Sequence, residues 1–171
     1  MLTLYPADPN QGSPYGTGTQ NALTPEFKRV ASFLGDVTFE ASRRSLLGSV
    51  SGKQKTWSYC TSQLLPYFLS LPHTHADSII VSAGLGLPYL GTPHGSDIQI
   101  IYGGKGLTDY LIHFATNLNP NGDSLPSWPE YTPASPQMLT FYAGVPTNIT
   151  QDTYRAEAIS YLEGLSRSNP V

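Results

Sequence analysis

The stretch Leu90-Gly91-Thr92-Pro93-His94-Gly95-Ser96-Asp97 places one histidine among glycine, proline and small polar residues. A histidine on such a loop, after a predicted strand, can serve as a general base. That chemistry also needs a nucleophile for the base to deprotonate and a carboxylate to orient the ring. Spacing alone leaves a generic loop histidine open as the alternative, so the interpretation depends on the partners of His94.

A serine nucleophile of the Gly-x-Ser-x-Gly type needs small flanking residues, because it sits on a tight strand-to-helix turn. The nearest match is Ile80-Val81-Ser82-Ala83-Gly84, in which a β-branched residue replaces the first glycine. Ser82 also lies only shortly before His94, with no room for a full helix between them. A second stretch, residues 48–52, has Val50 at its centre. We therefore expect no nucleophile in these residues.

The other candidate groups in the sequence predict neither a metal site nor a cofactor site. His73, His75 and Asp77 would share one face of a strand, but three ligands at alternate positions crowd one side of an ion and no clear fourth exists. A polar loop with chance histidines explains them better. The run Gly103-Gly104-Lys105-Gly106 lacks both the earlier glycine and the Ser or Thr of a phosphate-binding loop.

Composition limits the remaining classes of function. The chain has 171 residues, enough for one domain or a piece of a larger one. Charged residues make up 12%, about half the usual share, and the net charge is −3. Because no basic stripe is present, we expect no nucleic-acid partner. The single cysteine, Cys60, cannot form an internal disulfide and is expected to be a small buried hydrophobe.

The chain shows no sign of a membrane segment. No apolar run reaches the roughly 18 residues that span a bilayer. Residues 1–6 lack the positive region and long apolar core of a signal peptide, so none is expected. The sequon at Asn148 would matter only in the secretory pathway.

Hydrophobic periodicity predicts several helices and strands. Residues 24–35 form the first helix, with Thr24 as N-cap and Gly35 at its exit. Its apolar stripe lies on one side, while Lys28 and Arg29 are expected in solvent. The stripe comprises Phe27, Val30, Ala31 and Leu34.

The pattern predicts further helices and strands after residue 35. Asp36 is expected to cap a helix ending near Leu47, in which Glu40 pairs with Arg43 or Arg44. A turn at 51–53 and a strand over 55–65 follow. Further on, the pattern predicts a helix over 107–115 with His113 exposed, a strand over 138–142 and a last helix over 150–165.

Several ordered stretches resemble the fungal type-B carboxylesterases and lipases, a family that includes the cholinesterases. Residues 5–15 look like the loop downstream of the family's acid residue, and 21–29 and 34–39 look like its next helices. The stretch Gly91-Thr92-Pro93-His94-Gly95-Ser96-Asp97-Ile98 looks like the histidine loop, and residues 114–121 and 128–131 look like its closing segment. Each match is moderately specific, and their shared order is the stronger signal.

This resemblance implies an α/β fold, namely the incomplete C-terminal portion of an α/β-hydrolase: its last sheet strands with their packing helices. His94 would be the general base and acid of a Ser-His-Glu (or Asp) triad, and Asp97 would cap or support its loop. The triad serine, the acid and the oxyanion-hole glycines belong upstream of Tyr5 in the family pattern. Residues 1–171 would be one partial carboxylesterase domain, and residues 66–86, which depart from the pattern, are expected to be an insertion.

Two hypotheses follow for function. The first is a fragment of a serine esterase or lipase that carries only the triad histidine, acts on carboxylic esters or lipids in the intact family, and is inactive alone. The second is a non-enzymatic module that binds itself or a larger hydrolase through exposed apolar faces. Members of the family are typically secreted.

Overall fold

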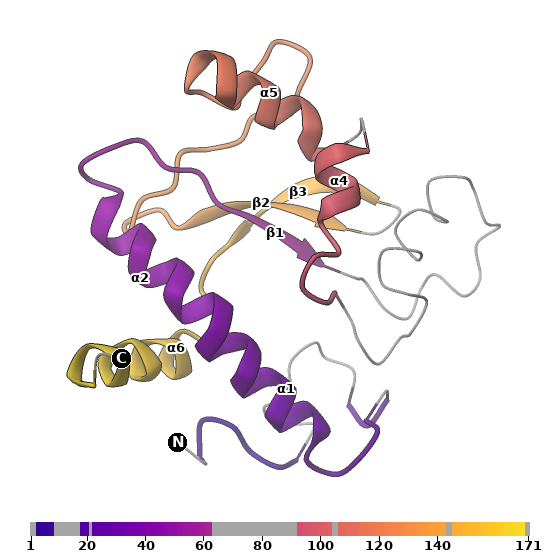
Figure 1. The fold of residues 1–171 in the computed structure, drawn as a ribbon, viewed down its shortest axis with the longest axis vertical. Coiled ribbons are helices and arrows are strands. Elements are labelled where there is room, and N and C mark those ends of the chain that lie inside the picture. Colours follow the sequence, from indigo (N-terminus) through magenta and orange to yellow (C-terminus); the bar gives the residue numbers. More distant parts are fainter. Residues whose placement is uncertain are drawn as a thin grey trace, which may run out of the picture. The chain divides into compact units, whose positions relative to one another are not determined.

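The structure is a computed structural model that describes residues 3–8, 18–20, 22–62, 92–103, 106–142 and 145–169. In chain order its elements are α1 (Phe27–Gly35), a π-helix η2 (Asp36–Glu40), α2 (Ala41–Val50), β1 (Tyr59–Ser62), α4 (Ile98–Tyr102), α5 (Leu107–Asn117), β2 (Gln137–Tyr142), β3 (Val145–Gln151) and α6 (Ala156–Ser168) (Figure 1). They fall into two compact units. None of the described helices is long and apolar enough to cross a bilayer.

The first unit comprises Met1–Thr56, Thr132–Pro136 and Asp152–Val171, and its main feature is one continuous helical run (Figure 1). The predicted helix over 24–35 is present as α1, but its predicted ends are wrong. Glu26, not Thr24, occupies the N-cap position, and no side chain caps the helix. Gly35 adopts helical φ and ψ of −59° and −45°, so the chain passes through η2 into α2 without an exit.

Asp36 does not cap a second helix, because its carboxylate is used elsewhere. It accepts a 2.7 Å hydrogen bond from the Tyr5 hydroxyl and forms an ion pair with Arg155. The predicted pair of Glu40 and Arg43 is confirmed at 2.6 Å. The apolar core of this unit is built around α2 and α6 by Tyr5, Ala41, Ala158, Ile159 and Leu162.

The second unit comprises Trp57–Tyr131 and Gln137–Gln151 and holds a three-stranded mixed sheet in the order β1-β2-β3. β1 runs parallel to β2, and β2 is antiparallel to β3. A parallel pair requires a crossover connection, and α4 and α5 lie in the chain between these two strands. The predicted α/β class is confirmed to this extent, as a small mixed sheet with helices.

Two predicted strands and one helix in this unit are present with altered ends. The strand expected over 55–65 is β1, Tyr59–Ser62 among the described residues, and the strand over 138–142 is β2. The helix over 107–115 is α5, which extends to Asn117. Its first turn packs into the core, where Leu107 and Tyr110 are 0% and 2% exposed.

The expectation of a helix from residue 150 was wrong. Residues Val145–Gln151 form β3, and α6 begins only at Ala156. β-branched residues favour this strand, and the hydroxyls of Thr150 and Thr140 share a 2.6 Å hydrogen bond across the β2–β3 pair. Arg155 then adopts a left-handed conformation with φ of 47° immediately before the helix.

Candidate functional site

His94 lies in a tight turn over residues 94–97 that leads directly into α4. The Ser96 amide donates a 3.0 Å hydrogen bond to the Pro93 carbonyl, and the Ile98 amide donates a 3.2 Å bond to the Gly95 carbonyl. Gly95 has φ of +83°, a conformation that side-chain-bearing residues rarely adopt. The imidazole of His94 is consequently presented from a short, sharply bent segment, and the residue is exposed.

The end of this turn is connected to the sheet by a side-chain hydrogen bond. The Tyr59 hydroxyl, from β1, donates to Asp97 Oδ2 at 2.7 Å. Burial of the phenol and the neighbouring Asp97 carboxylate both raise the pKa of Tyr59, so the hydroxyl keeps its proton. Asp97 also starts α4 with its carbonyl, which accepts 2.9 Å bonds from the amides of Ile100 and Ile101. The expected supporting role for Asp97 thus has a geometric basis in the contact with Tyr59.

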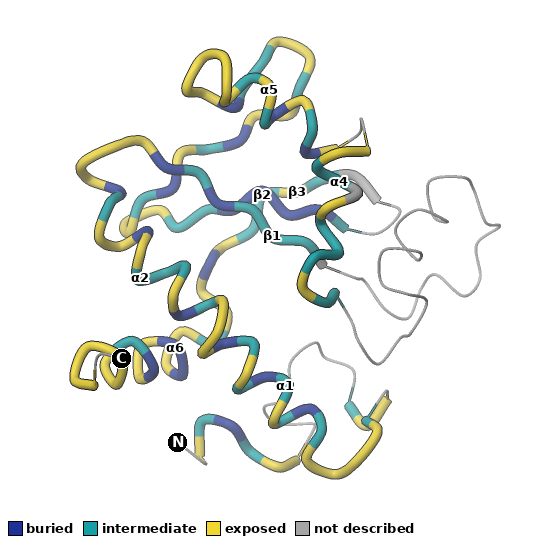
Figure 2. The backbone as a smooth tube through the Cα atoms, in the orientation of Figure 1, coloured by how far each residue is buried: buried dark blue, intermediate teal, exposed yellow. Residues whose placement is uncertain are grey.

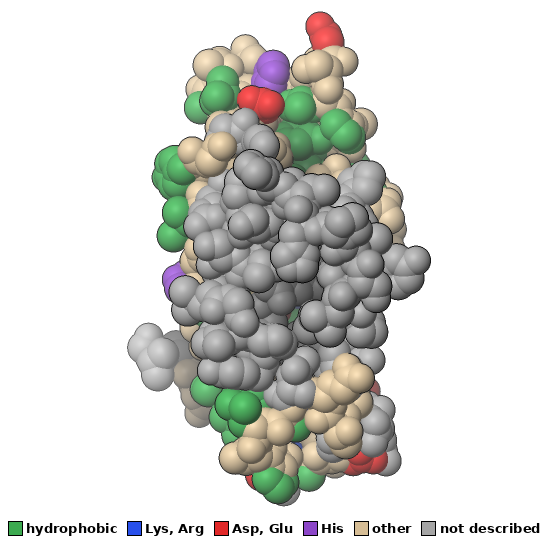
Figure 3. All heavy atoms as spheres, turned by 90° about the vertical axis from the view of Figure 1, so that its right-hand side faces the viewer, with side chains coloured by type: hydrophobic (Ala, Val, Ile, Leu, Met, Phe, Trp, Pro, Cys, Tyr) green, Lys and Arg blue, Asp and Glu red, His purple; other side chains and the backbone are tan. Residues whose placement is uncertain are grey.

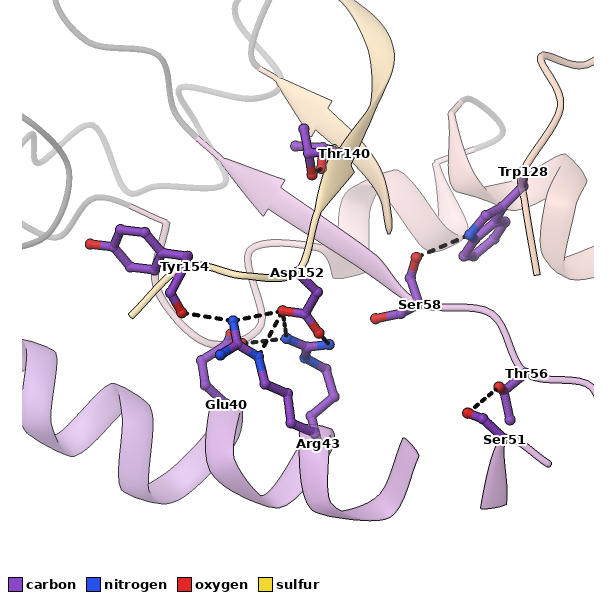
Figure 4. Close-up of polar contacts among 11 residues, drawn as sticks. Glu40, Arg43, Ser51, Thr56, Ser58, Trp128, Thr140, Asp152 and Tyr154 are labelled. Carbon is purple, nitrogen blue, oxygen red and sulfur yellow. Dashed lines mark hydrogen bonds and ion pairs between the residues drawn. The ribbon is translucent and has the colours of Figure 1, made fainter. Parts of the chain in front are cut away.

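Tyr59 is itself held by aromatic packing. Its ring makes edge-to-face contacts with Trp128 at 6.3 Å and Phe141 at 6.4 Å between centroids. The Trp128 indole donates a 3.0 Å hydrogen bond to the Ser58 carbonyl (Figure 4). Tyr110 completes the cluster and donates from its hydroxyl to the Pro126 carbonyl at 2.7 Å. A strand residue fixed on several sides is a firm anchor for the His94 turn.

An imidazole is a common general base and general acid in enzymes. In a serine hydrolase the histidine acts as the base, and the acyl group is carried by a separate serine hydroxyl. The other reactive groups identified in the sequence, namely Ser82, His73, His75 and Asp77, lie outside the described residues, as do Lys105 and the expected insertion at 66–86. His113, expected to be exposed, is half-buried on α5. Cys60, expected to be buried, is half-buried in β1.

The first unit contains two buried ionic clusters that the sequence did not predict. Asp152, whose side chain is fully buried, accepts hydrogen bonds from Arg43 at 2.7 and 2.8 Å and from Arg44 at 2.8 Å (Figure 4). Burial alone would raise the pKa of Asp152, but the two guanidinium groups lower it. Nothing in the local sequence marks these charges as buried, because their partners lie more than 100 residues apart.

The second ionic cluster joins the N-terminal segment to the end of the chain. Besides the pair with Asp36, Arg155 lies over the Tyr5 ring, with its guanidinium carbon 5.3 Å from the ring centroid. It also donates a 2.9 Å hydrogen bond to the Ser32 carbonyl. These contacts turn the polar side of α1 inward. Lys28 is 5% exposed, so the expectation that it is solvated was wrong.

Comparison with known proteins identifies the relatives of this chain. It is 32% identical to Lipase 1 of Geotrichum candidum, 35% identical to Lipase 2 of Diutina rugosa and 31% identical to Secreted lipase 1 of Botryotinia fuckeliana, each over 95% of its length. The chain is homologous to a part of these fungal lipases. The resemblance inferred from the sequence is thereby confirmed, although no family model matches.

The match is almost complete for this chain but partial for its relatives. The chain spans 26% of Lipase 1 of Geotrichum candidum and 27% of Lipase 2 of Diutina rugosa. Some of the relatives carry the word secreted in their names. A match to about a quarter of a lipase does not by itself assign the activity of the whole lipase to this chain.

Proposed function

We propose that this chain is the segment of a fungal carboxylic-ester hydrolase that supplies the triad histidine, His94. In the complete enzyme the imidazole would accept the proton of a serine hydroxyl as that oxygen attacks the ester carbonyl. It would then give this proton to the departing alcohol. In the second half of the reaction it would accept a proton from water, which attacks the acyl-enzyme carbonyl, and return that proton to the serine.

One observation carries the proposal: in a chain that matches fungal lipases over 95% of its length, an exposed histidine sits on a sharply bent turn fixed to a sheet strand. General bases work best when held within a fraction of an ångström of their productive position. The bond from Tyr59 to Asp97 provides such restraint three residues after His94. Carboxylic esters, including lipids, are the corresponding substrate class.

The fold proposed for the intact enzyme is an α/β-hydrolase, of which this chain is the C-terminal portion. The serine, the acid and the oxyanion hole would then lie in the rest of the lipase. Loss of these groups costs many powers of ten in rate. We therefore expect purified 1–171 to show no saturable turnover of p-nitrophenyl butyrate and no labelling by an organophosphate serine probe. Stoichiometric labelling of any serine would overturn this assignment.

The direct test is a chimera in which this chain replaces the matching quarter of Lipase 1 of Geotrichum candidum. The chimera is expected to hydrolyse p-nitrophenyl butyrate, and His94→Gln should reduce kcat by at least about a thousandfold. His113→Gln is the matched control, because it changes another histidine in the same unit and should leave the rate within about threefold. Full activity in the His94→Gln chimera would show that His94 is not the base.

The second candidate is a non-enzymatic module that binds itself or a larger hydrolase through apolar faces. It is favoured by the large hydrophobic side chains at the surface, such as Leu34 at 53% and Leu46 at 62% exposed. Figure 3 shows hydrophobic side chains at the surface on one face of the molecule. A soluble, monodisperse protein made from a transcript that begins at Met1 would support this candidate. An upstream Gly-x-Ser-x-Gly in the same reading frame would favour the first.

A further inference from the structure

The stretch Asn148-Ile149-Thr150 is the one Asn-x-Ser/Thr motif in the sequence, and its middle residue is not proline. Such a motif can accept an N-linked glycan in a protein of the secretory pathway, provided that it lies at the surface. Motifs of three residues also occur by chance. What this one means therefore depends on where the fold places its two polar side chains.

The motif lies in β3, the last strand in the order β1-β2-β3 of the described sheet. Side chains alternate between the two faces of a strand. Ile149 packs against the apolar cluster that contains Leu139 and Phe141, so Asn148 and Thr150 belong to the opposite face. Asn148 is exposed there, and Figure 2 shows half-buried and exposed positions next to one another along β3. The acceptor asparagine is therefore accessible to solvent.

The two polar side chains of the motif make different contacts. Asn148 Oδ1 accepts a 2.8 Å hydrogen bond from the adjacent Ile149 amide, and no described residue accepts a hydrogen bond from Asn148 Nδ2. An asparagine Nδ2 carries two hydrogens, of which glycan attachment replaces one. The Thr150 hydroxyl shares a 2.6 Å hydrogen bond with the Thr140 hydroxyl. Attachment of a glycan at Nδ2 thus breaks no hydrogen bond among the described residues.

N-linked glycosylation also requires passage through the secretory pathway. Secreted lipase 1 of Botryotinia fuckeliana, which is 31% identical to this chain, is named as a secreted protein. The same route is what glycosylation requires of this chain. The requirement can be imposed experimentally by a secretory leader, so the site can be tested separately from the natural location of the protein.

We propose that Asn148 is an N-glycosylation site. Nδ2 forms a bond to the anomeric carbon of a lipid-linked oligosaccharide diphosphate, and the bond from that carbon to the diphosphate oxygen breaks. The lipid diphosphate leaves and Nδ2 gives up one proton, so no oxidant or reductant is needed. The inference goes beyond the proposed function and does not depend on the role of His94, which takes no part in this reaction.

The first test is expression of the whole chain behind a secretory leader in yeast, with and without Asn148→Gln. Peptide N-glycosidase removes the glycan and converts its asparagine to aspartate, which peptide mass spectrometry locates. We expect the wild type to migrate as a heavier form that the glycosidase converts to a lighter one, and Asn148→Gln to give only the lighter form. Thr150→Ser retains the hydroxyl and should keep the glycan, whereas Thr150→Val should lose it.

The matched control moves the motif to an exposed turn of the same chain. Lys53→Asn together with Lys55→Thr, on the Asn148→Gln background, places the motif around the exposed Gln54 and should restore a glycosidase-sensitive form. If this control carried a glycan and the wild type did not, the inference would be overturned, because the host would then glycosylate this chain at an accessible motif but not at Asn148.

The second test places the site in a complete enzyme, the chimera with Lipase 1 of Geotrichum candidum. Peptide mass spectrometry of the secreted chimera should find the glycan at Asn148, and the His94→Gln chimera should carry it equally. A glycosylated but inactive chimera would support the inference and count against the proposed function. An active, secreted chimera with unmodified Asn148 would overturn the inference and leave the role of His94 standing.

Discussion

The hydroxyl of Tyr59 donates a 2.7 Å hydrogen bond to Asp97 Oδ2, joining strand β1 to the turn that carries His94. The two residues are 38 positions apart in the sequence. Asp97 supplies two acceptors, a carboxylate oxygen for Tyr59 and a carbonyl for the first amides of α4. A single residue thus sets both the start of the helix and its position beside the strand.

Removal of this bond should impair catalysis more than folding. In the chimera, Tyr59→Phe is expected to lower kcat about tenfold to a hundredfold with little change in KM, because a displaced general base weakens the chemical step rather than binding. The free energy of unfolding should fall by only about 1 to 2 kcal/mol. Steady-state kinetics and urea unfolding of the same preparation provide both values.

Tyr110→Phe is the matched control for that variant. Tyr110 belongs to the same aromatic cluster and also donates a 2.7 Å hydrogen bond, but to the Pro126 carbonyl. Its loss should lower stability by a similar amount and leave kcat within about threefold. If both variants reduced kcat equally, the cluster would act only through general stability and Tyr59 would have no special part in positioning His94.

The buried carboxylate of Asp152 should make the stability of the first unit depend on pH. Its pKa is lowered in the folded state by Arg43 and Arg44. A group with a lowered pKa stabilises the fold above its unfolded value, about 3.9, and loses that contribution as the pH falls through the folded value. Asp152→Asn should therefore cost about 2 to 4 kcal/mol at pH 7 and much less once the wild-type carboxyl is protonated.

Urea unfolding at pH 7 and at progressively lower pH measures this difference directly. Glu163→Gln is the control, because Glu163 pairs with a largely exposed Arg167 at 3.3 Å. Its effect at pH 7 should stay below about 0.5 kcal/mol, as for most surface pairs on a helix. A penalty for Asp152→Asn that did not change with pH would mean that packing, and not charge, explains the contribution of this side chain.

Replacement of Trp128 should show how strongly the aromatic cluster holds the sheet. Trp128 is 4% exposed, and its indole is hydrogen-bonded to the Ser58 carbonyl. Trp128→Phe loses buried area and leaves that carbonyl without this donor, at a cost of about 2 to 4 kcal/mol. Trp57→Phe should cost about 1 kcal/mol, because Trp57 is half-buried and retains edge packing against Phe114. The chain has two tryptophans, so the fluorescence of each variant reports unfolding through the other.

The sequence predicted the helices and strands that have a clear hydrophobic period. The helix over 107–115 and the strand over 138–142 were found because their hydrophobic periods agree with their structure. β3 was missed, since its pairing with β2 depends on contacts such as Thr140 with Thr150 that a periodicity argument does not contain. The continuous passage through Gly35 was missed as well, because glycine permits a helix exit without requiring one.

Which side of a helix is buried was harder to predict than the helix itself. The stripe of Val30 and Leu34 was identified from its spacing, and Lys28, which lies off that stripe, was expected in solvent. Within this unit the side with Lys28 and Ser32 is buried instead. For the site, the sequence supplied His94 and a supporting role for Asp97. It could not supply Tyr59, because a tyrosine in a strand gives no sign that its hydroxyl reaches a distant turn.

Gly95 offers the most local test of the His94 turn. Its φ of +83° penalises a side chain, whereas the added Cβ would meet Ile98 Cδ1 at 3.6 Å, which is ordinary contact. The cost of Gly95→Ala is therefore conformational, about 1 kcal/mol or more, and the backbone can relieve it by moving His94. Gly95→Asn should cost less, because asparagine tolerates positive φ better than alanine. We expect the chimera to lose more activity with alanine than with asparagine; the reverse order would indicate that side-chain volume, and not backbone geometry, governs the presentation of His94.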